Sequence, residues 1–269
     1  MLSFSKVAYV RTNLKIDLNY LIERVLMNKM LFILTFIISA LVIGACGINL
    51  NIDVEKGSGI IVTEERSVSD FDRLDLSGIG DVTLIQGDQE SLKIEAEDNV
   101  IKHITSEVRN GTLYIAFDRK TIIPTESVIF TVTMNSIRGL DTKGVSNLQS
   151  ESLTTDSLEV GISGTGNIQL EKLTADKLSI NVSGAGNFQA SGTVNSQKVS
   201  LSGAGNYEGE DLQCKTAEVT ITGIGRISLW VTDNLDVTIS GTGGVDYYGT
   251  PRITQQISGV GKINHKGNK

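Results

Sequence analysis

The chain has 269 residues and a formal net charge of −7, with 31 acidic and 24 basic side chains. A negative surface repels phosphate backbones, so the composition argues against a nucleic-acid partner. Two cysteines and two histidines are too few for a disulfide framework or for a Cys- or His-rich metal site. The length suits one elongated domain or two small β units.

The first part of the chain has the pattern of an export signal. Residues Met30–Ala45 are almost wholly apolar, interrupted by Thr35 and Ser39. A membrane-spanning helix needs about 20 such residues, and this run is shorter. Lys29 precedes the run as a positive flank, which is typical of the hydrophobic region of a signal peptide.

The apolar run ends in Ile43-Gly44-Ala45-Cys46. Small residues directly before a Cys resemble the lipobox of bacterial lipoproteins. The resemblance implies cleavage before Cys46 and its modification by thioether-linked and amide-linked acyl chains such as palmitate, and two or more chains give stable anchoring. Cys46 is therefore the expected lipid-attachment site, on the outer membrane or cell surface of a bacterium, with the periplasmic face as an alternative. A cleaved soluble protein with an incidental Cys46 is the other interpretation.

The segment from Gly57 to Leu140 is predicted to be β structure of low regularity. It contains one glycine-rich phrase, Ser77-Gly78-Ile79-Gly80-Asp81, and strand-like runs at Leu92–Ala96 and Val128–Met134. Asn110-Gly111 lies between two short apolar stretches, which is a strong signal for a β-hairpin turn.

From Ser163 onward, one short phrase returns about every 20 residues, and such a period indicates a repeat architecture. The copies are Ser163–Asn167, Ser183–Asn187, Ser202–Asn206, Thr222–Arg226, Ser240–Gly244 and Ser258–Lys262, with a degenerate copy at Lys143–Asn147. Between copies, apolar residues alternate with polar ones, which predicts strands. The glycines and Asn of each phrase permit positive φ, so each phrase is expected to form a tight corner.

These patterns predict an all-β fold, namely a parallel β-helix or solenoid of roughly 20-residue coils, preceded by a less regular β segment with a hairpin. Stacked Asn side chains at the corners can satisfy one another and the turn backbone. A calcium-binding nonapeptide roll is the alternative for these corners, but it needs Gly-Gly-x-Gly-x-Asp at about half this period. We therefore expect structural corners without a metal.

The chain divides into six expected parts. They are an overextended reading frame (1–26), a lipoprotein signal peptide (27–45), a tether (46–56), the irregular β segment (57–140), the β-helix repeats (141–264) and a tail (265–269). The first 45 residues carry more basic than acidic side chains, so their removal makes the remaining chain more acidic.

One stretch carries a specific family resemblance. Phe71-Asp72-Arg73-Leu74-Asp75-Leu76-Ser77-Gly78-Ile79-Gly80-Asp81-Val82 is followed by Asn110-Gly111-Thr112-Leu113 and then by the run of Ser-Gly-x-Gly-Asn corners. This order resembles the auto-transporter adhesin head domain family, also called the head GIN domain. The resemblance spans about Gly57 to Lys262 and implies an exported, often lipid-anchored β-helical protein. It supplies no catalytic residues.

Candidate catalytic groups are few. β-Helices also carry polysaccharide lyases and hydrolases, which need clustered carboxylates or a Lys or Arg base. The densest acidic group in the repeats is Glu208, Glu210 and Asp211, and we expect its members to point to different faces. Cys214 aligns over Ala175 as an inward-facing residue. The sequence thus predicts no catalytic residue, no cofactor and no metal.

The aromatic residues leave room for a binding role. Phe188 and Tyr207 align with the apolar Ile168 and are expected in the core, whereas Tyr247-Tyr248 must place at least one ring outward on a strand. The resulting hypothesis is a lipid-anchored, non-enzymatic, adhesin-like binding module for a glycan or a surface protein. A carbohydrate-active enzyme on the same scaffold and a purely structural envelope protein are the alternatives.

Overall fold

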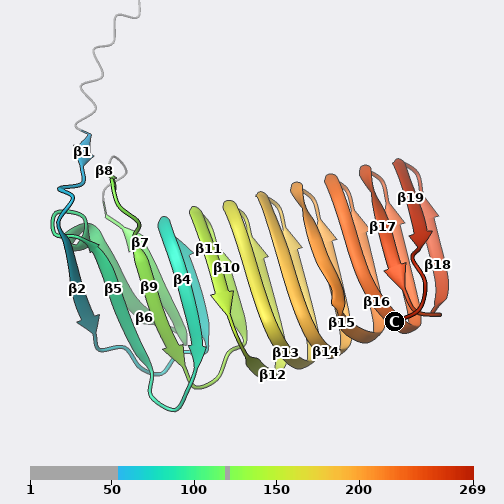
Figure 1. The fold of residues 1–269 in the computed structure, drawn as a ribbon, viewed down its shortest axis with the longest axis horizontal. Helices are drawn as coiled ribbons and strands as arrows, with labels where there is room; N and C mark the ends of the chain where they lie inside the picture. The colour runs from blue at the N-terminus through green and yellow to red at the C-terminus, as the bar shows by residue number, and fades with distance from the viewer. Residues whose placement is uncertain (1–53, 119–121) are drawn as a thin grey trace, which may run out of the picture. The chain divides into compact units, whose positions relative to one another are not determined.

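The computed structural model describes residues 54–118 and 122–269, which belong to one compact unit. This part of the chain is built from strands, with one short 3₁₀ helix, η1 (Ile101–His103) (Figure 1). The strands of its first half are β1 (Glu55–Lys56), β2 (Ile61–Arg66), β3 (Arg73–Ser77), β4 (Ile79–Gln86), β5 (Ser91–Glu97), β6 (Ile104–Arg109), β7 (Thr112–Phe117), β8 (Ile122–Ile123) and β9 (Ile129–Met134). Those of the second half are β10 (Gly139–Thr142), β11 (Val145–Ser150), β12 (Leu153–Ile162), β13 (Thr165–Val182), β14 (Ala185–Leu201), β15 (Ala204–Ile221), β16 (Ile224–Ile239), β17 (Thr242–Tyr248), β18 (Arg252–Ile257) and β19 (Val260–His265).

The second half is a parallel β-solenoid of about six turns, as predicted. Each coil pairs in parallel with the next, and corner residues lie over corner residues: Thr165 pairs with Ala185, which pairs with Ala204. The coils follow one another along the stack from β12 to β19 (Figure 1).

The first coil of the stack comes from the irregular segment. Strands β3 and β4 pair directly with β10 and β11, so that Leu76 lies beside Thr142 and Val82 beside Leu148. The chain between them forms β5 to β9, of which β7 pairs with β3 and β9 with β4 on the other side. We call the strands β1, β2 and β5–β9 the N-terminal cap, because they cover this end of the stack. The early glycine-rich phrase is therefore a true corner, separated from its neighbour by the inserted cap.

The predicted hairpin is confirmed. Strands β6 and β7 pair antiparallel, and the turn residues Asn110 and Gly111 have φ of 51° and 75°. Two successive residues with positive φ give the backbone twist that matches two-residue hairpins.

The core runs along the inside of the stack. Strand alternation turns every second residue inward, which gives columns such as Ile162, Val182, Leu201, Ile221 and Ile239. Burying each such side chain contributes roughly 1.5–3 kcal/mol. Phe188 and Tyr207 are buried with ring centroids 5.6 Å apart, so their prediction as core residues is confirmed.

The corner glycines serve a purpose different from the one expected. Among those described, positive φ occurs at Gly80 and Gly166, so the positive-φ expectation was wrong for the remaining corners. The common requirement is close approach: a Cβ added to Gly205 would lie 1.8 Å from the carbonyl oxygen of Gly186. The backbones stack directly at each corner, and Ala204 N donates to Gly184 O at 2.9 Å.

The Asn column at the corner is a hydrogen-bonded ladder, as predicted. Asn147 donates to Asp81 (2.9 Å), Asn167 to Asn147 (3.0 Å), Asn187 to Asn167 (2.9 Å) and Asn206 to Asn187 (3.1 Å). Each amide oxygen can also accept a backbone N–H of the next coil, as Asn206 does from Arg226 (3.1 Å). These contacts account for the Asn residues without a ligand.

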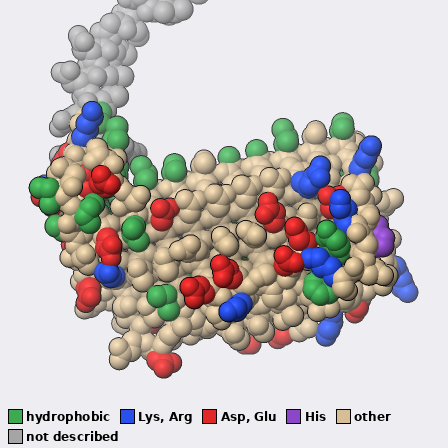
Figure 2. Space-filling view, viewed as in Figure 1, with side chains coloured by type: hydrophobic (Ala, Val, Ile, Leu, Met, Phe, Trp, Pro, Cys, Tyr) green, Lys and Arg blue, Asp and Glu red, His purple; other side chains and the backbone are tan. Residues whose placement is uncertain are grey.

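The residue between the two corner glycines points into solvent. Ile79, Val145, Ile224 and Val260 occupy this position on different coils and are 44% to 73% exposed. Apolar side chains are accordingly spaced along the upper edge of the solenoid in Figure 2. Because the neighbouring glycines set the corner geometry, this position accepts residues of different sizes.

Candidate functional site

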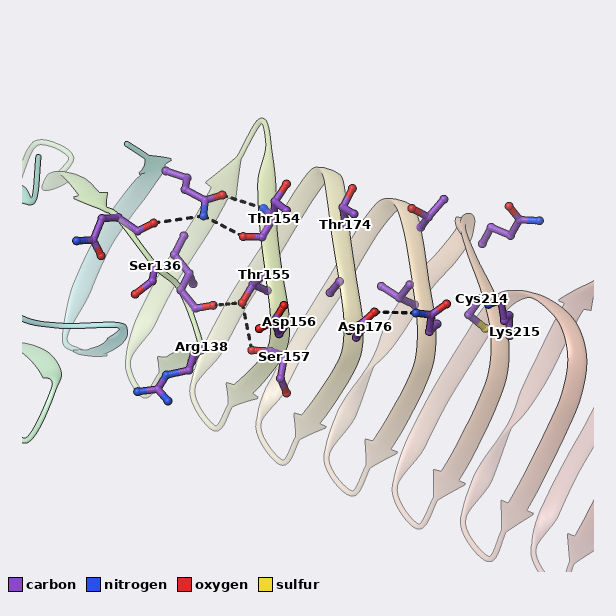
Figure 3. A pocket seen from close by; sticks show the side chains of 18 of the residues that line it. Ser136, Arg138, Thr154, Thr155, Asp156, Ser157, Thr174, Asp176, Cys214 and Lys215 are labelled. Carbon is purple, nitrogen blue, oxygen red and sulfur yellow. Dashed lines mark hydrogen bonds between the residues drawn. The ribbon is translucent and has the colours of Figure 1, made fainter. Parts of the chain in front are cut away.

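A groove of about 770 Å³ crosses successive coils of the solenoid (Figure 3). One row along it consists of Thr154, Thr174, Thr193 and Gln213, and a second row consists of Asp156, Asp176, Asn195 and Lys215. Thr155, Ala175, Val194 and Cys214 lie between the two rows. All of these belong to β12 to β15, so each coil contributes one residue to each row.

The repeat itself builds the groove. Thr154 pairs with Thr174 and Thr174 with Thr193, so hydroxyl groups recur at the coil spacing of about 4.8 Å. The row between is buried and small at Ala175 and Val194. Because these side chains are small and point inward, they form the floor of the groove between the two polar rows.

Side chains of the first coils close one end of the groove. The Gln86 amide accepts from Thr154 N (2.8 Å) and donates to Thr154 O (2.9 Å). The Gln86 side chain thereby makes the two backbone hydrogen bonds that a neighbouring strand would otherwise make with Thr154 at the edge of β12. Thr155 Oγ1 also donates to Ile137 O at 2.7 Å. These contacts fix the backbone at the point where the groove begins (Figure 3).

The groove presents hydrogen-bonding groups and charges of both signs. Asp176 accepts from Asn195 Nδ2 at 2.7 Å, and Asp156 and Lys215 are exposed. Arg138 lies at one end, where its guanidinium pairs with Asp72. No aromatic ring is among the described residues that line the groove. Such a surface can hydrogen-bond a polar, extended molecule along its length.

Cys214 lies inside the coil, as predicted, in register with Val194 and Val231. Burial raises the pKa of its thiol to about 11, against the opposing effect of a hydrogen bond from Gln197. Gln197 Nε2 lies 3.0 Å from the sulfur, and its Oε1 accepts from the buried Tyr207 hydroxyl at 2.5 Å. A buried thiol with a raised pKa is a poor nucleophile.

Sequence reasoning missed Gln197. It occupies an inward column in register with Leu178 and Ala217 and is buried. Both neighbours in this column are apolar, and the Tyr207 hydroxyl supplies the reason for an amide at Gln197. Gly209 leaves room for that ring, since a Cβ there would lie 2.4 Å from the hydroxyl oxygen.

The acidic group Glu208, Glu210 and Asp211 is arranged differently from the prediction. The three do not diverge to separate faces but line one pocket of about 50 Å³ together with Glu171. Sites for small molecules usually enclose roughly 300–1,000 Å³, so this pocket is too small for a sugar ring. Asp211 also pairs with Lys269 at 2.5 Å, a contact that the sequence did not indicate.

The other acidic groups are engaged in local contacts. Glu64 pairs with Arg66 (2.8 Å) and Glu95 with Lys93 (2.5 Å). Glu97 is buried in the cap and accepts from Gly59 N (2.7 Å) and from both the backbone and the hydroxyl of Thr125. Burial alone would raise the pKa of Glu97, but these hydrogen bonds outweigh burial and lower it.

Several predictions concern residues outside the described ranges. Cys46, the expected lipid-attachment site, and the segments 1–26 and 27–45 lie there. Over residues 54–118 and 122–269, no group of three or more His, Cys, Asp or Glu side chains is placed to hold a metal ion. Within the same ranges, no helix has the length and apolarity to span a membrane.

The order of corners, cap and hairpin agrees with a family model described as "Putative auto-transporter adhesin, head GIN domain", which matches residues 70–251. The chain belongs to this family. The matched range begins just before β3 and ends just before β18. The head GIN domain of this chain therefore contains the first coil, most of the cap and the groove. Membership indicates a protein of the bacterial surface or envelope.

Solved structures agree with the family. A putative adhesin from Bacteroides fragilis is 28% identical, with a TM-score of 0.76 over 78% of this chain and 99% of its own. A putative adhesin from Parabacteroides distasonis is 20% identical, with a TM-score of 0.61 over 79% and 100%. A protein from the same organism, named a putative lipid binding protein, is 23% identical, with a TM-score of 0.61 over 78% of this chain and 98% of its own. The last two show the fold alone. None of the curated proteins matches the chain.

Proposed function

We propose that this head GIN protein is a lipid-anchored, non-enzymatic binding module of the bacterial envelope, and that the groove over β12–β15 is its binding surface. The observation that carries the proposal is the repetition of Thr154, Thr174 and Thr193 along one side of a 770 Å³ groove. Equally spaced hydroxyls suit a ligand that is itself repetitive and polar. A glycan chain fits this description best, and an extended segment of a surface protein is the second candidate.

The relatives support an adhesin-like role. The Bacteroides fragilis protein, which carries the name of a putative adhesin, covers the same unit. The groove adds a physical basis for such a role, because it spans successive coils and offers donors and acceptors without a deep pocket. Binding of this type depends on many weak contacts along a surface, so losing the shape of the groove has a larger effect than losing one hydroxyl.

The groove is tested by filling it. Thr174→Lys/Thr193→Lys introduces two long side chains on its exposed row, and we expect at least a tenfold loss of binding on an array of glycans and extracellular-matrix proteins. Thr165→Lys/Thr242→Lys is the matched control, because these threonines are exposed at the corner position outside the groove. Equal binding by both variants would exclude the groove as the site.

The lipid anchor has a separate test. Mass spectrometry of the protein from native membranes should find an N-terminal, acylated Cys46 after removal of residues 1–45, and Cys46→Ala should release the protein from the membrane fraction. A soluble product with a different N-terminus, unchanged by Cys46→Ala, would contradict this part of the proposal.

A carbohydrate-active enzyme is the competing function. We expect no cleavage of polysaccharides, because the acidic pocket of Glu208, Glu210 and Asp211 is about 50 Å³ and Asp211 is paired with Lys269. If an activity screen finds cleavage, and Glu208→Gln or Asp211→Asn abolishes it, the protein is an enzyme and the proposal of a non-enzymatic binding module is wrong.

A further inference from the structure

The last coils carry a second polar site, beyond the groove. The Lys269 ammonium lies 2.5 Å from Asp211 Oδ1 and 2.6 Å from the carbonyl oxygen of Glu210. It also lies over two aromatic rings, 4.9 Å from the centroid of Tyr248 and 5.9 Å from that of Trp230. We call Asp211, the Glu210 carbonyl, Trp230 and Tyr248 the ammonium box.

The box is assembled by the coil register. Trp230 of β16 pairs with Tyr248 of β17, and Gln213 of β15 pairs with Trp230. The same row holds Thr174 and Thr193 on earlier coils. Aromatic residues thus replace hydroxyl and amide groups where the row passes beyond the groove. Each of the two rings presents a π face to the Lys269 ammonium, and such a face attracts cations electrostatically.

Backbone hydrogen bonds hold the segment that connects β19 with Lys269. After β19, Lys266 N donates to Tyr247 O (2.8 Å), and Gly249 N donates to Gly267 O (3.0 Å). The side chains of Lys269 and Asp211 are 27% and 71% exposed. The box is therefore open to solvent beside the lysine, and a ligand can reach it once residues 268 and 269 move aside.

We propose that the ammonium box is a binding site for primary alkylammonium groups, such as the side chain of a lysine in a protein ligand, and that Lys269 of the same chain occupies it in the absence of that ligand. An ammonium group has three donors and no acceptor. The carboxylate and the carbonyl accept two of the hydrogens, while the two ring faces attract the positive charge. Because a tethered group acts at an effective concentration on the order of millimolar, Lys269 excludes weaker external amines.

Trp230 makes the site directly measurable, since it is the single Trp of the chain. The probe is Nα-acetyl-lysine amide, which keeps its side-chain ammonium group. It is titrated while Trp230 fluorescence is recorded. Lys269→Met removes the charge but keeps an unbranched side chain, and this variant should show a saturable change. The wild-type protein should require at least about ten times more probe, because Lys269 competes.

Three controls separate recognition from a general effect. N-acetyl-norleucine amide lacks the ammonium group and should give no saturable change with Lys269→Met. Lys266→Met makes the same substitution at a residue outside the box and should behave like the wild type. Lys269→Met/Asp211→Asn should lose binding of the lysine probe, and Asp211 is exposed enough for this variant to fold, which its thermal unfolding curve checks.

The proposal is overturned if Lys269→Met shows no saturable response to the lysine probe, or the same response to the norleucine probe. In that case Lys269 is a structural contact of the last coil. The result is independent of the groove, because it uses a different ligand and does not change the threonine row.

Discussion

The N-terminal cap and the regular coils are stabilised in different ways. In the coils, backbone hydrogen bonds and equivalent residues repeat at every turn, as in the Asn ladder from Asn147 to Asn206. In the cap, contacts are individual: Arg66 donates to Ile104 O (2.8 Å) and Ile101 O (3.3 Å), and Glu97 binds two separate loops. A solenoid obtains its register from repetition, whereas its end needs specific polar side chains.

The largest expected effect concerns the corners. Gly205→Val should destabilise the protein by about 4 kcal/mol or more or prevent folding, because its side chain would overlap the Gly186 carbonyl. Ala204→Val is the neighbouring control, since Val145 occupies the same corner position on another coil, and it should change stability by less than about 0.5 kcal/mol. Urea unfolding measures both. Similar midpoints would disprove the close-approach explanation of the corner.

In the cap, Glu97→Gln should cost about 2 kcal/mol at pH 7, because one carboxylate oxygen is replaced by an NH₂ group that must face the N–H of either Gly59 or Thr125. The cap lowers the pKa of Glu97 from its ordinary value of 4.5. Its contribution is therefore present above pH 4.5 and is lost as the pH falls through the lowered pKa.

Urea unfolding of wild type and Glu97→Gln across pH 2–7 should accordingly show two stability curves that converge in acid. Glu95→Gln, on the exposed pair with Lys93, should cost less than about 1 kcal/mol. A Glu97→Gln deficit that stays constant down to pH 2 would mean that the charge of Glu97 is not what holds the cap.

A smaller effect is expected inside the coils, where Gln197 breaks the repeat. Tyr207→Phe leaves the Gln197 Oε1 without its donor and should cost about 1–2 kcal/mol. Adding Gln197→Leu, the residue found at the equivalent Leu178, should recover most of that loss, because both polar partners are then gone. A thermodynamic cycle from chemical unfolding tests the pair, and additive losses would show that the two groups act separately.

The smallest change in stability is expected at Cys214. Cys214→Val should stay within about 1 kcal/mol of the wild type, since Val194 and Val231 occupy the same column on the adjacent coils. In a Cys46→Ala background, Cys214 is the single thiol, and its raised pKa of about 11 predicts slow alkylation by iodoacetamide at pH 8. Alkylation should become fast in urea, and fast labelling of the folded protein would contradict the burial.

Sequence alone was sufficient for the regular coils. The period of about 20 residues, the strand alternation and the Gly and Asn corners each depend on neighbours in the same or the next coil, so one pattern describes all of them. The hairpin at Asn110-Gly111 was predictable for the same reason, because two adjacent residues determine the turn. The core positions of Phe188 and Tyr207 followed from alignment with Ile168.

Sequence alone was not sufficient where residues far apart come together. The Asp81–Asn147 contact joins residues 66 positions apart, and no period links them, because the cap is inserted between them. The partner of Asp211 is Lys269, 58 positions away. The groove also required the structure, since its depth depends on how the chain bends between Thr174 and Asp176.

The sequence by itself determined the repeat, the parallel solenoid and the family, because a local pattern that recurs at fixed spacing specifies its own stacking. The tertiary structure decided three further features: the placing of β3 and β4 as the first coil, the buried amide of Gln197, and the box that holds Lys269. Each of these depends on which side chains meet across coils. These contacts depend on the insertion of the cap, the volume inside the coil and the path of residues 266–269. The repeat period of about 20 residues specifies none of the three.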